Sequence, residues 1–376
     1  MRVLFVSYPA IGHVFPTIPL AWALRSAGHE VLVASAGDAL EAANAGLHVA
    51  DVSPGFELEG FLQSTAGELM ARLRGPGGVD PMDGLRLFTH LNDHLADGIV
   101  RTADAFRPDL IVFEQIFVSG LIAAARLGVP AVQHNFGFAR GTQLRELTVS
   151  MLGETMARHG VAGVPADVPV IDIAPPSMAE PERDGWSMRP VPYNSGAVLP
   201  DWLLDEPQGR RIGVTLGTAS VHVNGLGPVQ RLVAAASAVD AEFVLALGDV
   251  DTAALGELPD NIRVVGWVPL TALLQTCDAA VHHGGAGTTL AALNAGVPQL
   301  VLPDGADRRI NAEAVRDRGA GLLGTAEDLD AEVLGRLLSD EKMSAVAREV
   351  REEIGRMPSP ASLVPRLEEL AAARHR

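Results

Sequence analysis

The sequence predicts an α/β protein with two Rossmann-like parallel-sheet domains that face each other across a cleft. Two strand–turn–helix junctions, one at the start of the chain and one after residue 278, are typical of such sheets. A proline-rich stretch over residues 184–208 separates two regions in which strands and helices alternate. The length of 376 residues suits two domains of this size.

The first junction begins the chain. Residues 2–6 form an apolar run typical of a short strand, and a turn is expected over residues 7–13. A helix over residues 17–27 and a second strand over residues 30–34 complete a βαβ unit. This unit places His13 at the carboxyl end of a parallel strand, where open α/β sheets bind ligands. On position alone, His13 is equally a polar residue near a helix start.

The rest of the first half continues the alternation. Strands are expected over residues 109–113 and 131–134, on either side of a helix over residues 120–127. Residues 55–83 contain several glycines and are expected to form an irregular helical or loop segment over the sheet. The prolines of residues 184–208 predict an extended, stiff connector without a helix.

The second half repeats the pattern. Strands are expected over residues 212–216, 243–247, 263–265, 279–281 and 299–302, and helices over residues 340–356 and 361–373. We therefore predict four segments. They are an N-terminal domain (1–190), a linker (191–207), a C-terminal domain (208–357) and a final helix (358–376).

The second junction is the most informative stretch. A short apolar strand leads into a glycine-rich turn with the sequence HHGGAGTT, residues 282–289, and the turn begins a helix. Such a turn directs unpaired backbone N–H groups and the positive end of the helix dipole at one point, which forms an anion site. Its glycines, two imidazoles and two hydroxyls suit a diphosphate better than a single carboxylate. The alternative is a tight turn with a solvated histidine pair.

Composition excludes several classes. The net charge of −17 argues against a nucleic-acid or anionic-membrane partner, because both need a basic face. No apolar run reaches the roughly 18 residues of a membrane span, and residues 3–6 are too few for a signal-peptide core. The single cysteine, Cys277, fits a reducing compartment and is expected to be a small core residue, so a cytoplasmic location is expected.

Three sets of residues then resemble one family, the GT-B glycosyltransferases. The first matches their donor signature, the second their acceptor-side motif and the third their interdomain linker. They are HHGGAGT (282–288), GVPQ (296–299), Pro303 and Asp307; GHVFP (12–16); and VPYN (191–194) with LPDW (199–202). The match spans residues 1–357 and is closest to actinobacterial enzymes that attach deoxysugars to polyketide and other antibiotic aglycones.

The resemblance implies the fold, the substrates and the reaction. The fold would be GT-B, with the final helix returning to the N-terminal domain. The enzyme would transfer a deoxysugar from a TDP-sugar to a hydrophobic aglycone such as an aromatic polyketide, with inversion and without a metal. No cofactor is expected beyond the TDP-sugar co-substrate, and a homodimer is one possible assembly.

The resemblance also implies roles for residues. His13 would be the base, because an imidazole is suited to proton transfer at neutral pH. Glu114 would orient it, although many relatives carry Asp there; the alternative is an acid exposed at a strand end. On the donor side, His283 would bind the phosphates and Trp267 would stack on the base; the alternative for Trp267 is an ordinary core residue. Asp307 and Arg308 would face the sugar. Relatives often carry Gln in place of Arg308, so the absence of Gln favours a sugar with fewer hydroxyls or a different contact by Arg308, which is equally a solvated residue at a helix start. The complete donor set is Gly12, Gly217, Thr218, Trp267, Val268, His283, Gly285, Ala286, Gly287, Thr288, Asp307 and Arg308.

Asp-x-Asp pairs bind divalent ions in another glycosyltransferase fold, GT-A. Two matches occur here, at residues 249–251 and 328–330. Aspartate is common before helices as a cap, so we interpret both as structural and expect no metal.

Functions of other classes remain open at this point. A sugar-nucleotide epimerase has the same two-lobed architecture and binds the same kind of donor. A non-catalytic glycosyltransferase partner would be expected to lack the cradle around His283 and Gly287, which is intact. An NAD-dependent oxidoreductase fits less well, because neither turn has the glycine spacing of a dinucleotide site.

Overall fold

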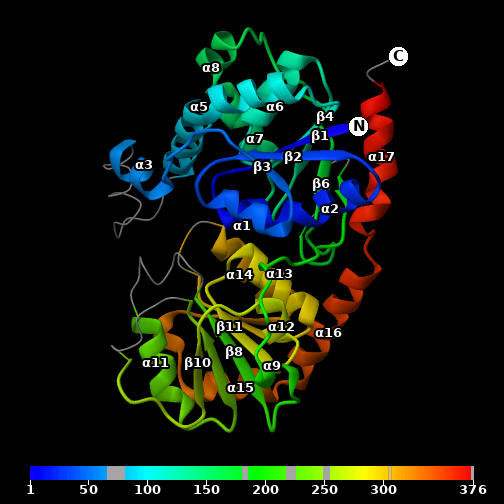
Figure 1. Ribbon diagram of the computed structural model, residues 1–376. Helices are drawn as coiled ribbons and strands as arrows, with labels where there is room; N and C mark the ends of the chain where they lie inside the picture. The colour runs from blue at the N-terminus through cyan, green and yellow to red at the C-terminus, as the bar shows by residue number, and fades with distance from the viewer. Residues whose placement is uncertain are drawn as a thin grey trace.

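The computed structural model describes residues 1–65, 81–179, 185–216, 226–248, 255–303, 305 and 307–373. Within them, two parallel sheets form two lobes, stacked one above the other in Figure 1. The predicted fold class, two Rossmann-like parallel-sheet domains, is confirmed.

The N-terminal lobe contains a seven-stranded sheet with the order β3-β2-β1-β4-β5-β6-β7. Its central strands are buried on both faces, and their sequences are almost entirely apolar, as is typical of parallel strands covered by helices. Its strands are β1 (Arg2–Val6), β2 (Glu30–Ser35), β3 (His48–Asp51), β4 (Leu110–Glu114), β5 (Ala131–His134), β6 (Val170–Asp172) and β7 (Trp186–Ser187).

Helices cover both faces of this sheet, and each face has its own apolar core. The described helices of the lobe are α1 (Ile11–Val14), η1 (Phe15–Thr17), α2 (Ile18–Ser26), η2 (Gly37–Ala45), α3 (Leu58–Thr65), α5 (Pro81–Phe106), α6 (Ser119–Leu127), α7 (Thr142–Ser150) and α8 (Gly153–Arg158).

The C-terminal lobe contains a six-stranded sheet with the order β10-β9-β8-β11-β12-β13. Its strands are β8 (Arg211–Thr215), β9 (Glu242–Ala246), β10 (Ile262–Val265), β11 (Ala279–His282), β12 (Gln299–Val301) and β13 (Gly321–Leu323). The helices after the N-terminal lobe are α9 (Asp201–Leu204), α11 (Gly227–Ala236), α12 (Leu270–Leu274), α13 (Ala286–Ala295), α14 (Arg308–Arg318), η4 (Ala326–Asp328), α15 (Ala331–Ser339), α16 (Glu341–Arg356) and α17 (Pro360–Ala372).

The last helix returns to the N-terminal lobe, as predicted. Helix α17 packs beside α2 (Figure 1). His29 Nε2 lies 2.9 Å from Glu368 Oε1, and the guanidinium of Arg366 lies 4.1 Å from the centre of the Trp186 ring. One apolar core also continues from the N-terminal lobe into α13 and α14 of the C-terminal lobe. Helix α17 contributes Leu363, Val364 and Leu367 to this core, so the helix and the core together join the lobes.

Two local predictions are wrong. The connector was expected to lack a helix, but α9 forms at Asp201 because Pro200 precedes its first residue, where no backbone donor is needed. His13 was expected in a turn, but it lies within the short helix α1, which begins directly after the extended residue Ala10. Within the segment 55–83, residues 58–65 are helical as α3, and residues 66–80 lie outside the described part.

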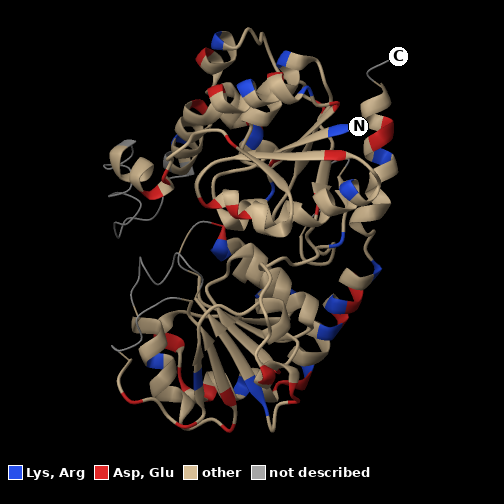
Figure 2. Ribbon diagram, in the orientation of Figure 1, with Lys and Arg blue, Asp and Glu red and all other residues tan. Residues whose placement is uncertain are grey.

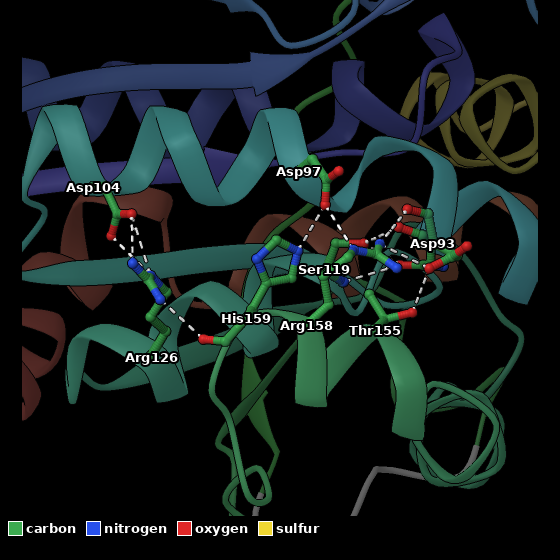
Figure 3. A network of polar contacts seen from close by, with 9 residues as sticks. Asp93, Asp97, Asp104, Ser119, Arg126, Thr155, Arg158 and His159 are labelled. Carbon is green, nitrogen blue, oxygen red and sulfur yellow. Dashed lines mark hydrogen bonds and ion pairs between the residues drawn. The ribbon is translucent and has the colours of Figure 1, made fainter.

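Helix α8 is fixed to α5 by a network of charged side chains (Figure 3). Arg158 contacts Asp93 at 2.9 Å and Asp97 at 3.0 Å, and His159 Nε2 lies 3.0 Å from Asp97. Burial raises the pKa of Asp93, but hydrogen bonds from Thr155 and Arg158 outweigh burial and lower it. Because the Asp93 carboxylate therefore stays ionised, its contacts with Thr155 and Arg158 hold α8 against α5 at neutral pH.

Charged residues lie mainly on the outer helices and at strand ends, where acidic and basic residues are interspersed, and the strand interiors are mostly uncharged (Figure 2). Among the described residues, no helix is long and apolar enough to cross a membrane.

Candidate active site

A cavity of about 470 Å³ lies between the two lobes and contains most of the predicted site residues. It is lined from the N-terminal lobe by α1, from the C-terminal lobe by the first turn of α13, and from the connector by residues 190–194. The predicted residues that line it are Gly12, His13, Trp267, Val268, His283, Gly285, Ala286, Gly287, Thr288, Asp307 and Arg308.

His13 lines this cavity and is paired with Glu114, which is not among the lining residues. The distance from His13 Nδ1 to Glu114 Oε1 is 3.5 Å. Glu114 ends β4 and is completely buried, so the alternative of an exposed strand-end acid is wrong. Its Oε1 accepts a hydrogen bond of 3.2 Å from the backbone N–H of Ile116, which orients the carboxylate. Oε2 has no hydrogen-bond partner among the described residues.

Two aromatic rings hold the imidazole of His13 in place. The centre of the Tyr8 ring lies 4.5 Å from that of His13, and the centre of the Phe136 ring lies 4.4 Å away on another side. Burial, with a smaller effect from Glu114, raises the pKa of Tyr8, so its hydroxyl stays neutral. The ring of His13 is therefore fixed by packing and leaves part of its surface facing the cavity.

The glycine-rich turn has the geometry expected of an anion site. Gly285 precedes helix α13, so Ala286, Gly287 and Thr288 form its first turn, where backbone N–H groups lack partners within the helix. Gly284 has φ +88°, and a Cβ there would lie 2.9 Å from the carbonyl oxygen of Arg308. A Cβ on Gly285 would lie 2.6 Å from His283 Nε2. Gly284 is thus required by its backbone conformation and by close packing, and the absence of a Cβ on Gly285 leaves room for the His283 ring.

The two histidines of this turn have different environments. His282 is completely buried; its Nε2 lies 2.7 Å from Gln299 Oε1, and its Nδ1 accepts the N–H of Gly284. Burial lowers its pKa to about 4, so the ring is neutral and structural. His283 instead lines the cavity beside the first turn of α13.

The donor side has an apolar end and a polar end. Trp267 remains 49% exposed although it lines the cavity, so it is not an ordinary core residue. At the other end, Asp307 lies directly before α14, and Asn311 Nδ2 lies 3.2 Å from its Oδ2. Asn311 also donates to the carbonyl of Gly284 at 2.8 Å, which connects Asp307 to the glycine-rich turn.

Several residues at or beside this site were not predicted from the sequence. Asn311 is one, although its position four residues after Asp307 on a helix was a usable signal. Tyr193 and Asn194 of the connector also line the cavity, and the Tyr193 ring packs on Phe15 and Trp22. Phe136 also lines the cavity. It lies in the loop directly after β5, at the carboxyl edge of the sheet, where open parallel sheets bind ligands.

Two predicted residues cannot be placed. Gly217 and Thr218 lie outside the described part of the chain. Thr215, the last residue of β8, lines the cavity. The Asp-x-Asp pair at residues 249–251 also lies outside it. In the second pair, Asp328 bonds to Thr325 and Asp330 caps α15, as predicted. No cluster of three metal-ligating side chains occurs within the residues that the structure describes.

Comparison with known proteins assigns the family. Residues 22–217 match the N-terminal domain, and residues 230–370 the C-terminal domain, of the erythromycin biosynthesis protein CIII-like family. The chain is 44% identical to the elloramycin glycosyltransferase ElmGT of Streptomyces olivaceus, over 98% of this chain and 97% of that protein.

Solved structures agree with this assignment. The glycosyltransferase SnogD of Streptomyces nogalater superposes with a TM-score of 0.87 at 40% identity, over 99% of each chain. The spinosyn rhamnosyltransferase SpnG, solved with thymidine diphosphate, gives 0.82 at 30% identity over 98% of this chain and 100% of that one. Together with the two facing parallel sheets and the cavity between them, these matches show that the chain belongs to the erythromycin biosynthesis protein CIII-like family and is a GT-B glycosyltransferase.

Proposed function

We propose that this glycosyltransferase moves a deoxysugar from a TDP-sugar to a hydrophobic aglycone such as an aromatic polyketide. Transfer would invert the anomeric carbon, and no metal would take part. The observation that carries the proposal is the placement of His13 and His283, from opposite lobes, on one cavity. A base and a diphosphate site on facing walls are what a direct displacement requires.

The donor assignment rests on the C-terminal wall. SpnG has been solved with thymidine diphosphate, and the same fold here provides the first turn of α13, His283 and the exposed ring of Trp267. The N–H groups of the turn would bind phosphate oxygens, and the indole would stack on the thymine ring. Asp307 and Arg308 would face the sugar, and this pair favours a sugar with few hydroxyls.

The acceptor assignment rests on the N-terminal wall. SpnG has also been solved with the spinosyn aglycone. Here the N-terminal side of the cavity is mainly apolar, with Ile11, Leu58, Phe136 and Ile173 on its surface beside the carboxylate of Asp38. Such a wall favours an acceptor with a large apolar body and one hydroxyl or activated carbon presented to His13.

The proposed reaction is a single displacement. His13 would take the proton of the acceptor hydroxyl while the oxygen of that hydroxyl attacks the anomeric carbon. The bond from that carbon to the diphosphate oxygen would break, and the electron pair would leave with TDP. The N–H groups of α13 and His283 would stabilise the departing charge, and Glu114 would stabilise the imidazolium.

The test uses two TDP-sugars that differ in one hydroxyl, a 2,6-dideoxyhexose and the matching 6-deoxyhexose, with an aromatic polyketide acceptor. We expect TDP release that depends on the acceptor, a product whose mass includes the sugar, and preference for the 2,6-dideoxy donor. The coupling constant of the anomeric proton should show inversion. TDP release without product, conversion of the donor to an isomer, or a retained configuration would contradict the proposal.

A further inference from the structure

The loop after β5, residues 135–141, contacts the C-terminal lobe at the active site. Three of its residues have three different contacts: Phe136 packs on the candidate base His13, Gly137 faces Ala286, and Phe138 is buried in the apolar core that both lobes share. Ala286 is the first residue of α13, on the donor side of the cavity. One short loop therefore connects the candidate base to the candidate diphosphate site.

Gly137 is required here by space and not by backbone conformation. Its φ lies outside the left-handed region that favours glycine. A Cβ at this position would lie 2.7 Å from the Cβ of Ala286 and 3.7 Å from Asn311 Oδ1. Carbon atoms in contact prefer about 3.5–4.0 Å, so one added methyl group would push the loop and α13 apart by about 1 Å.

The surroundings leave little room to absorb that push. Gly137, Phe138 and Asn311 are buried, and Ala286 is held in the first turn of a helix. Asn311 bonds to both Gly284 and Asp307, so the donor turn cannot yield without disturbing the residues that would face the sugar. Close-packed interiors transmit such strain instead of absorbing it.

We propose that the contact of Gly137 with Ala286 sets the distance between His13 and the donor turn, and that Gly137 is a positioning residue for transfer. This inference rests on the proposed function, because it matters only if the base and the diphosphate act on one reaction. The contact fixes the separation of the lobes at the point where the acceptor oxygen must reach the anomeric carbon.

The experiment is a double-mutant cycle with Gly137→Ala, Ala286→Gly and the double variant. Because a misplacement of about 1 Å can cost about 10²-fold in rate, Gly137→Ala should lower kcat by about that factor and leave the Kd for TDP, measured by calorimetry, nearly unchanged. Removing the facing methyl group should relieve the contact. The double variant should therefore recover at least about tenfold in kcat relative to Gly137→Ala.

A matched control is Gly163→Ala, also in the N-terminal lobe, because Gly163 is exposed and open space surrounds its α-carbon. Its kcat should equal that of the wild type. If Gly137→Ala does not fold, Ala286→Val adds bulk to the same contact from the other side and should lower kcat in the same way. A normal kcat for Gly137→Ala, or a double variant whose loss is the product of the single losses, would overturn the inference.

Melting temperatures separate this inference from the proposed function. If the wild type transfers no sugar, the proposed function fails. The contact is then judged by whether Ala286→Gly restores the melting temperature that Gly137→Ala lowers. Restoration would support the contact as the limit on lobe approach, and additive losses would overturn it.

Discussion

Nδ1 of His13 lies 3.5 Å from Oε1 of Glu114, and that carboxylate is completely buried at the end of β4. An anion removed from water interacts strongly with a positive charge that develops beside it. The pair would therefore favour the imidazolium that the proposed mechanism requires His13 to form. The rings of Tyr8 and Phe136 restrict the imidazole to this arrangement.

The first prediction concerns the base. Replacing His13 with Ala should lower kcat by about 10²–10⁴-fold, because general base catalysis contributes on this scale. TDP binding, measured by calorimetry, should survive, since the proposed diphosphate site lies in the other lobe. The exposed His48 provides a control, and His48→Ala should have normal kinetics. Near-normal turnover by the His13 variant would remove it from the mechanism.

The second prediction concerns Glu114. The change Glu114→Gln keeps the shape of the side chain but removes its charge, so kcat should fall, by less than in His13→Ala, because the imidazolium loses stabilisation. Glu114→Asp keeps the charge but shortens the reach to His13, so it should retain more activity than Glu114→Gln. Equal activity of all three proteins would mean that the carboxylate is purely structural.

Much of this architecture could be read from the sequence. Residues 110–114 and 279–282 form buried strands that appear as apolar runs, and Asp340 caps α16 at the expected position. Helix α5 was not predicted, although apolar residues follow one another at helical spacing at Leu91, Leu95 and Ile99, and all three are buried. That signal was present in the sequence.

The remaining features are tertiary and could not be predicted from local patterns. Phe136 packs on His13, which lies more than a hundred positions away in the chain, and the hydrophobic periodicity of the sequence does not indicate this contact. The burial of Glu114 depends on the elements that cover the end of β4. The contact of Gly137 with Ala286 depends on how the two lobes dock, which propensities do not encode.

The third prediction concerns stability and pH. His134 and His282 are completely buried, and burial lowers the pKa of each to about 4. An unfolded histidine titrates near about 6.5, so between these values the unfolded chain binds more protons. The stabilisation that comes from keeping these two histidines neutral should therefore be complete above about pH 6.5. The free energy of unfolding should decline as the pH falls from there toward about 4. Each histidine should contribute about 3 kcal/mol to this decline.

Urea unfolding near pH 7 and near pH 4.5 tests this expectation. In His134→Asn, the free energy of unfolding should drop less between the two pH values than in the wild type, by up to about 3 kcal/mol. The exposed His48 again provides the control, since His48→Asn should leave the difference unchanged. Identical differences for His134→Asn and the wild type would show that His134 does not carry this dependence.

The fourth prediction concerns the diphosphate. His283 lines the cavity beside the first turn of α13, so His283→Ala should weaken TDP binding by about 1.5–3 kcal/mol, the loss of one charge-assisted hydrogen bond. In calorimetry this is a Kd increase of about 10- to 150-fold. Thymidine, which lacks phosphates, should bind both proteins equally. Equal TDP affinity in the two proteins would place the diphosphate elsewhere.

The last prediction concerns metal. If the N–H groups at the start of α13 and His283 carry the diphosphate charge, turnover needs no divalent ion and should persist in excess EDTA. Asp328 and Asp330 are already engaged, with Thr325 and with the N–H of Val333, so neither is arranged to hold an ion. The measurement is the rate of product formation with EDTA, and then with added Mg²⁺ or Mn²⁺. A complete loss of turnover in EDTA that either ion restores would contradict this prediction. It would show that a metal ion neutralises the diphosphate, and the Asp-x-Asp pair at residues 249–251 would then be the first candidate for its ligands.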